Sequence, residues 1–460
     1  MLSLDHHSRR NFLKVGTLGL GGLSLTDLMA LRSFGSSGNR LLKDKSVIFL
    51  FMHGGPSQFE TFDPKMDMPS DIRSATGEIP TSIPGITFGS TLQRLSKLAD
   101  KFSVVRSFYT GDGQHDIKPI MCRQTLGANM GSLYSRIAGP IRPRSAMPSN
   151  VALYPQAVDE NTMPPILNFG DFNSSGDLGV AYSPFVPGAG SGLQADMKLN
   201  LKPDRIDDRK SLLAGIDGWR RMIDTAGVVD GLSEFQQQAF STLQREVHRA
   251  FDLSHEDPRL IARYDTAPLV PKNSIRKVWK NRERYADNAA SLGKLMLLAR
   301  RLCERDVGFV TVTTNFVWDM HADQNNATMP EGMGYVGLPF DHAISAFIED
   351  VESRGLRDKI LLVCCGEMGR TPRINARGGR DHWGGLAPLM VYGGGLKMGR
   401  VIGQSTRDGG EPDSNGYNIN NLMATIMHTL LDVGEVRVAD GLPRKLVDTV
   451  AGGTPIDELI

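Results

Sequence analysis

The most constraining feature of the sequence is an almost wholly apolar run that ends in a glycine-rich turn. Residues 46–52 read Ser-Val-Ile-Phe-Leu-Phe-Met, and His53-Gly54-Gly55-Pro56 follow directly. A short run of β-branched and aromatic residues, bounded by glycine and proline, is typical of a parallel strand buried on both faces. The run therefore predicts an α/β fold. Because open α/β sheets place their sites just beyond such strands, His53 is the first candidate site residue.

Similar apolar runs recur along the chain and alternate with helical patterns. Buried strands are predicted at residues 46–52, 102–107, 309–314, 360–365 and 388–392. Apolar residues at helical spacing predict helices at 341–354, at 422–431 and over much of 210–251. This alternation predicts a doubly wound, mostly parallel sheet. We therefore expect one α/β domain over residues 45–460, with a helical insertion at about 205–255 and long loops, some with short strands, at 60–95 and 140–200.

Charge and cysteine usage exclude several classes of protein. The net charge is +1, from 52 basic and 51 acidic side chains, so the sequence offers no electrostatic attraction for nucleic acid, and we expect none as a partner. The cysteines are Cys122, Cys303, Cys364 and Cys365, and none are spaced as Cys-x-x-Cys. We interpret the adjacent pair as small buried apolar residues, and we expect no thiolate zinc site.

The first 35 residues have the pattern of an export signal. Arg9 and Arg10 precede Phe-Leu-Lys, and a short glycine-rich apolar stretch follows from residue 15 to about residue 31. A basic segment followed by a short apolar one is the form of a signal peptide, and the paired arginines resemble a twin-arginine (Tat) signal. We therefore expect export by the Tat route to the periplasm or cell envelope, with membrane contact only through this segment if it stays uncleaved. An ordinary N-terminal amphipathic helix is the alternative.

Four short motifs carry side chains that can bind metals near the predicted strand ends. They are His53, Trp-Asp-Met-His at 318–321, Gly-Glu-Met-Gly-Arg at 366–370 and Gly-Arg-Asp-His at 379–382. Carboxylates and imidazoles together suit a divalent ion such as zinc, calcium or manganese. We predict a metal site at the carboxyl edge of the sheet; its candidate ligands are His53, Asp319, His321, Glu367, Asp381 and His382. A hydrogen-bonded Asp–His network without an ion is the alternative.

The same motifs resemble the DUF1501 family. The blocks that carry the resemblance are residues 52–58, 318–321, 366–372 and 379–383, and the likeness extends from about residue 45 to the C-terminus. That family is grouped with the alkaline-phosphatase/sulfatase superfamily, whose enzymes use one or two metals and a Ser, Thr or formylglycine nucleophile to cleave phosphate or sulfate esters. The resemblance therefore implies an alkaline-phosphatase-like fold and metal-dependent ester hydrolysis.

The chain departs from the superfamily pattern at three points. His53 stands where the first strand usually ends in a metal-binding Asp, and Glu367 followed by Met stands where an Asp-His pair is common. The loop at 109–116 has Thr110 as its only serine or threonine, so that His115 or Asp116 occupies the position of the nucleophile. We therefore take His115 and Asp116 as catalytic candidates.

Two arginines flank the third and fourth motifs. Arginine forks match phosphate and sulfate oxygens. Arg370 is accordingly a catalytic candidate that would stabilise charge on the transferred group, and Arg380 is a substrate-binding candidate. The alternative for both is an ion pair with a nearby carboxylate such as Glu367 or Asp381.

Two functions follow from these patterns. The first is a metal-dependent hydrolase of sulfate or phosphate esters in the cell envelope, acting on a small-molecule or polysaccharide ester. The second is a non-catalytic exported binding protein that retains the alkaline-phosphatase-like fold. Fold resemblance alone does not choose between them.

Overall fold

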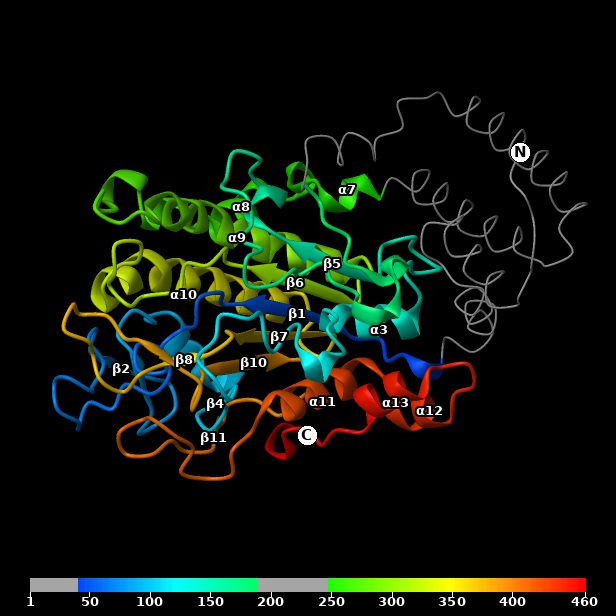
Figure 1. Cartoon of the computed structure of the whole chain (residues 1–460). Coiled ribbons are helices and arrows are strands. Elements are labelled where there is room, and N and C mark those ends of the chain that lie inside the picture. Colours follow the sequence, from blue (N-terminus) through cyan, green and yellow to red (C-terminus); the bar gives the residue numbers. More distant parts are fainter. Residues whose placement is uncertain (1–39, 189–246) are drawn as a thin grey trace, which may run out of the picture.

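A seven-stranded, mostly parallel sheet forms the centre of the protein. The computed structural model describes residues 40–188 and 247–460, and Figure 1 shows the sheet between two layers of helices. The strands run in the order β11-β4-β10-β7-β1-β6-β5. Their bounds are β1 Ser46–Phe51, β4 Phe102–Val105, β5 Asn150–Leu153, β6 Phe309–Thr313, β7 Ile360–Cys365, β10 Leu389–Gly393 and β11 Val401–Ile402.

Among the described strands of this sheet, only β10 runs in the opposite direction. It pairs antiparallel with both β4 and β7, whereas β1 pairs parallel with β6 and β7. The five predicted strands are all present, and the predicted doubly wound, mostly parallel α/β fold is confirmed. In the described part of the chain, two short antiparallel ribbons lie outside the sheet; they pair β2 Glu78–Pro80 with β3 Thr87–Gly89, and β8 Gly369–Arg370 with β9 His382–Trp383.

Helices cover both faces of the sheet because its strands are apolar on both sides. Ile48 and Leu50 of β1 belong to one core, and Val47, Phe49 and Phe51 belong to the other. The first core is closed by α8 Pro258–Tyr264, α9 Arg282–Glu304, α10 Met329–Ser353 and the 3-10 helix η1 Leu95–Lys101. The second is closed by α3 Met130–Ala138, α11 Ile419–Leu430, α12 Val433–Val438 and α13 Arg444–Ala451.

The two adjacent cysteines follow the same alternation. Cys364 lies in the first core and Cys365 in the second, and both thiols are free and fully buried. Burial raises the pKa of each thiol. Their interpretation as small buried apolar residues agrees with this placement.

Two sequence predictions fall largely outside the described residues. The signal segment at 1–35 lies wholly outside them. The helical insertion at about 205–255 is described only from residue 247 onward, a part that contains α7 His248–Phe251. Within the described part of the chain, no helix combines the length and apolar character needed to cross a membrane.

Candidate metal centre

The polar motifs converge at the carboxyl edge of the parallel strands. His53 follows β1, Asp319 and His321 follow β6, and Glu367 follows β7. His382 precedes β10, and it reaches the same edge because β10 runs in the opposite direction. The β8–β9 ribbon, which pairs Arg370 with His382, brings the third and fourth motifs side by side.

Three side-chain atoms face one another at this edge. Nε2 of His115 lies 3.1 Å from Nε2 of His382, and Oδ1 of Asp319 lies 3.5 Å from the first nitrogen and 3.2 Å from the second. Among the described residues, these three form the one group of this kind that could hold a metal ion. We call them the His115–Asp319–His382 centre.

Asp319 is fixed by contacts to both of its oxygens. Oδ1 accepts a hydrogen bond from Nη2 of Arg370 at 2.7 Å, and Oδ2 accepts one from Nδ2 of Asn326 at 3.0 Å. Nε2 of His321 lies 3.1 Å from Oδ2, and the ring centroid of His321 lies 5.3 Å from that of His382. Burial opposes the charge, but Arg370 and the neighbouring histidines outweigh it and hold the pKa of Asp319 well below its usual range. The carboxylate is therefore ionised.

His115 is oriented by Glu367. Its Nδ1 lies 2.9 Å from Oε1 of Glu367, and the backbone N–H of Gly54 donates to both oxygens of that carboxylate, at 2.9 and 3.1 Å. This contact directs Nε2 of His115 toward the centre, as in the carboxylate–histidine pairs of metal sites. Without an ion, burial lowers the pKa of His115, but the hydrogen bonds and charges of Asp319 and Glu367 raise it to about 9.

The glycine at position 54 is required by close packing of two loops. Its φ is +113°, and a Cβ there would lie 2.5 Å from the backbone nitrogen of Asp319. Glycine alone tolerates both the positive φ and this approach. The turn after β1 can therefore pack against the loop that carries Asp319, and the N–H of Gly54 can still donate to Glu367.

His53 lies in an aromatic pocket beside His115. Its ring contacts Phe51, Phe172 and Phe316, with centroid separations of 5.4, 5.6 and 4.8 Å. Phe316 also lies 4.8 Å from the ring of His115, so the two histidines share this neighbour. Nε2 of His53 is buried without a hydrogen-bond partner among the described residues. Burial lowers the pKa of His53 to about 4, which keeps the ring neutral.

Two predicted carboxylates point elsewhere. Asp116 is exposed and pairs with Lys118 at 2.6 Å, although its neighbour His115 reaches the centre. Asp381 is also exposed, and its Oδ1 accepts from Asn375 at 3.0 Å. Successive side chains of extended backbone point to opposite sides, so His382 can face the centre only if Asp381 faces away.

The two predicted arginines are buried and bonded within the protein. The Arg370 guanidinium donates to Asp319 and to the backbone carbonyls of Gly54, Gly55 and Arg380. Arg370 therefore touches the centre only through Asp319.

Arg380 serves the surrounding loops. It pairs with the buried Glu60 at 3.1 Å, lies 4.2 Å above the ring centroid of Phe59, and donates to the carbonyls of Ile72 and Arg73 at 2.8 and 2.9 Å. The alternative of ion pairs fits both arginines, but their partners are Asp319 and Glu60 rather than Glu367 or Asp381.

Asn326 and Phe316 contribute to the centre but were not predicted from the sequence. Asn326 follows the Trp-Asp-Met-His motif by five residues, in an Asp-Gln-Asn-Asn turn whose composition signals only a loop. Phe316 has a φ of +67° and follows Asn315, whose φ is +52°. Such angles cost energy in residues other than glycine and cluster at functional sites, but no sequence pattern reveals them.

The fold and the centre together define an α/β protein with a histidine–aspartate site at the carboxyl edge of a mostly parallel sheet. The chain belongs to the DUF1501 family, described as "Protein of unknown function (DUF1501)", whose sequence model matches residues 44–460. The resemblance drawn from the motifs is thereby confirmed. No curated protein matches the chain.

Solved structures with a similar arrangement include three hydrolases. The PsFucS1 sulfatase from Pseudoalteromonas sp. is 10% identical, with a TM-score of 0.37, over 94% of this chain and 76% of its own. The phosphonate monoester hydrolase SpPMH from Silicibacter pomeroyi is 11% identical, with a TM-score of 0.34, over 90% and 78%. The phosphonate monoester hydrolase of Agrobacterium radiobacter is 10% identical, with a TM-score of 0.30, over 90% and 78%. Likenesses of this size carry no information on substrate.

Proposed function

We propose that the protein is a metal-dependent hydrolase of sulfate or phosphate esters that works in the cell envelope. The observation that carries the proposal is the His115–Asp319–His382 centre, in which two imidazole nitrogens and one carboxylate oxygen face one another at 3.1–3.5 Å. Bonds of about 2.0–2.1 Å to one tetrahedral ion place neighbouring ligand atoms about 3.3 Å apart. The separations therefore fit a shared ion.

The surroundings of the three atoms support the same interpretation. Glu367 accepts from Nδ1 of His115, which leaves Nε2 as a lone-pair donor to a metal. In the ion-free protein the two nitrogens at 3.1 Å share the proton of His115, and a cation between them would replace that proton. The mixed nitrogen and oxygen donors suit zinc or manganese, and calcium fits less well because it prefers oxygen.

The chain's own residues then have separate tasks. His115, Asp319 and His382 would hold the ion, Arg370 and Asn326 fix the Asp319 carboxylate, and Glu367 orients His115. A metal bound here would polarise an ester oxygen and lower the pKa of a coordinated water. His321, whose Nε2 lies 3.1 Å from Asp319, is partly exposed and is placed to exchange a proton with a substrate.

Metal binding and turnover of model esters test the proposal. Protein stripped of metal should bind zinc or manganese with about one ion per chain, and His382→Ala should abolish that binding. Asp381→Asn is the matched control, because it changes the adjacent, exposed side chain. The metal-loaded protein should hydrolyse an aryl sulfate or an aryl phosphate. A wild-type protein that takes up no ion, measured by elemental analysis and calorimetry, contradicts the proposal.

One observation favours the alternative of a non-catalytic binding protein. Both candidate arginines are buried and occupied by protein groups, so neither presents a free guanidinium to a transferred sulfate or phosphate group. A protein that binds a metal at the centre but hydrolyses neither ester would favour this second function.

Export by the Tat route is part of the proposal. It is supported by Arg9 and Arg10 ahead of a weakly apolar stretch. Replacing both arginines with lysine should keep the chain out of the envelope, as measured by cell fractionation. Wild-type amounts of the double variant in the envelope would exclude this route.

A further inference from the structure

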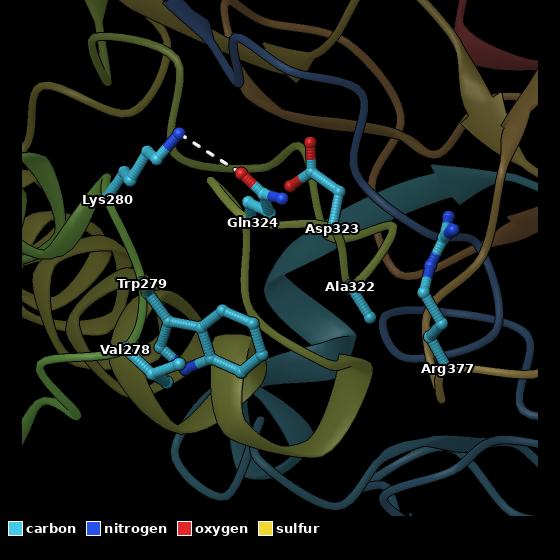
Figure 2. A pocket seen from close by; sticks show the side chains of 7 residues that line it. All are labelled: Val278, Trp279, Lys280, Ala322, Asp323, Gln324 and Arg377. Atoms are coloured by element: carbon cyan, nitrogen blue, oxygen red, sulfur yellow. Dashed lines mark hydrogen bonds between the residues drawn. The ribbon is translucent and has the colours of Figure 1, made fainter.

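A wide groove opens beside the loop that carries Asp319 and His321. It is lined by residues 278–280, residues 322–324 and Arg377, and it has a volume of about 610 Å³. Figure 2 shows these side chains arranged around an open space, with Trp279 on one side and Arg377 on the other. We call it the Trp279 groove. Its volume suits a ligand of one or a few sugar rings.

The groove and the centre share one loop as a common wall. Asp319 and His321 point from this loop toward the centre, while residues 322–324 of the same loop line the groove. The other side of the groove is tied to the same loop, because the amide of Asn375 donates to the carbonyl of His321 at 3.0 Å. A Cβ at Gly379 would lie 2.3 Å from that carbonyl carbon, so the two loops are in contact. The groove therefore lies next to the centre, on the other side of this loop.

Trp279 provides a rigid aromatic surface in this groove. Its indole N–H donates to Glu331 at 2.9 Å, and the Arg276 guanidinium lies 5.8 Å from the ring centroid. Glu331 also forms an ion pair with Arg276 at 2.6 Å. The two residues that contact the indole therefore fix each other's position. The adjacent Val278 is 57% exposed. The guanidinium covers one face of the indole, and the ring is partly buried against the core. The part of the indole that lines the groove is a flat, preorganised surface that suits a sugar ring.

The charged side chains of the groove favour an anionic ligand. Lys280 and Arg377 are both exposed, and the amine of Lys280 has only a neutral partner here, the amide oxygen of Gln324 at 3.2 Å. The carboxylate of Asp323 is occupied by the backbone N–H groups of Asn325 and Asn326, each at 2.7 Å. The groove therefore carries two cations and one carboxylate, a net charge of +1.

We propose that the Trp279 groove binds the sugar part of an anionic saccharide ester whose ester group lies at the His115–Asp319–His382 centre. The inference rests on the proposed hydrolase function, and it names the substrate as a sulfated or phosphorylated saccharide. Trp279 stacks on a sugar ring, and Lys280 and Arg377 bind a further anionic group on the same chain.

The test uses the full chain and two oligosaccharides of comparable backbone. One is derived from κ-carrageenan and is sulfated, and the other is derived from agarose and is neutral. Binding is measured by calorimetry and by saturation-transfer NMR, with and without zinc. The wild-type protein should bind the sulfated oligosaccharide about tenfold more tightly than the neutral one. Trp279→Ala should weaken binding of both by about tenfold.

A double variant that removes both cations separates the contribution of charge to binding from that of stacking on Trp279. Lys280→Ala combined with Arg377→Ala should remove the preference for sulfate and its dependence on salt, while binding of the neutral oligosaccharide is kept. Both side chains are exposed, so this variant should fold even if Trp279→Ala is unstable. Lys277→Ala is the control, because Lys277 is exposed and next to the groove but does not line it.

The outcomes for the groove and for the hydrolase are distinguishable. A wild-type protein that binds neither oligosaccharide, or groove variants that behave like Lys277→Ala, would overturn the groove proposal even if aryl esters are hydrolysed. A protein that binds no metal and hydrolyses no ester would overturn the hydrolase function, whatever the groove binds.

Discussion

At the scale of single residues, the candidate site depends on the carboxylate of Asp319. Its Oδ1 faces Arg370, His115 and His382, and its Oδ2 faces His321 and Asn326. One buried negative charge therefore aligns groups from four segments of the chain. Removal of that charge would leave Arg370 buried without its counter-ion, which is costly.

Glu367→Gln isolates the contribution of the residue behind His115. The amide keeps the size of the carboxylate and can still accept from Gly54, but it removes the charge next to Nδ1 of His115. Changes to the partner of a ligating histidine typically lower metal affinity by about 10–100-fold. We expect a loss of this size in zinc titrations, with the fold preserved in circular dichroism. Unchanged affinity would show that Glu367 does not tune the centre.

Metal affinity should depend on pH with a definite sign. In the ion-free protein, the pKa of His115 is raised to about 9, so the ring carries a proton at neutral pH. A metal can bind only the neutral nitrogen, so binding below pH 9 displaces that proton. The apparent affinity should fall by up to about tenfold for each pH unit between 9 and 7. Calorimetry in buffers of different ionisation enthalpy should show proton release, and its absence would contradict this assignment.

The sequence located most of the centre but not which side chains reach it. Asp319, Glu367 and His382 were expected at one sheet edge, and the structure brings them there with His115 between them. Asp381 faces away because it precedes His382 in extended backbone, a local geometry that motif spacing does not encode. A motif identifies the loop, and the backbone angles decide which of its residues points inward.

At the scale of elements, buried arginines hold the loops of the site together where regular structure is sparse. Arg380 joins the loop that carries it to the segment at residues 59–73 through Glu60 and backbone carbonyls. Such a cross-link fixes the position of β9, and with it His382.

Arg380→Met should destabilise the protein strongly. It leaves the buried Glu60 without its partner, and breaking a buried ion pair typically costs about 3–5 kcal/mol. Urea unfolding should show a loss of that order. Arg373→Met is the matched control, because Arg373 lies on the same loop but pairs with Asp71 in solvent, and its stability should stay close to wild type. Similar behaviour of the two variants would contradict this account.

Elements with uniform burial were predictable, and elements of mixed character were not. Strands β1 and β7 are buried along their whole length and appear in the sequence as apolar runs. Helix α9 was not predicted. Its buried side includes Arg300 and Arg301, which pair with acidic groups inside the fold and interrupt the apolar stripe. That pairing depends on distant residues such as Asp350 and Glu256, so local sequence does not reveal it.

At the scale of the whole molecule, the strand order makes the first strand indispensable. β1 lies between β6 and β7, and no pairing joins β6 to β7 directly. A fragment of residues 260–460 would therefore expose the apolar edges of both strands. We expect this fragment to be insoluble or unfolded, and limited proteolysis of the intact chain should not release it as a stable product. Recovery of a cooperatively folding fragment would contradict the proposal of one domain.

The reversed direction of β10 changes which segments of the chain can place side chains at the carboxyl edge of the parallel strands. In an all-parallel sheet, the segments that precede the strands lie at the amino edge. Only the segments that follow the strands then lie together at the carboxyl edge. Because β10 is antiparallel to β4 and β7, the segment before β10 lies at the same edge as the segments that follow β4 and β7. His382 belongs to the segment before β10. The segment at residues 371–388 therefore reaches the site without a crossover helix, through the β8–β9 ribbon. In related chains, we expect the counterpart of His382 in the segment before a strand. The counterparts of His115 and Asp319 should follow strands.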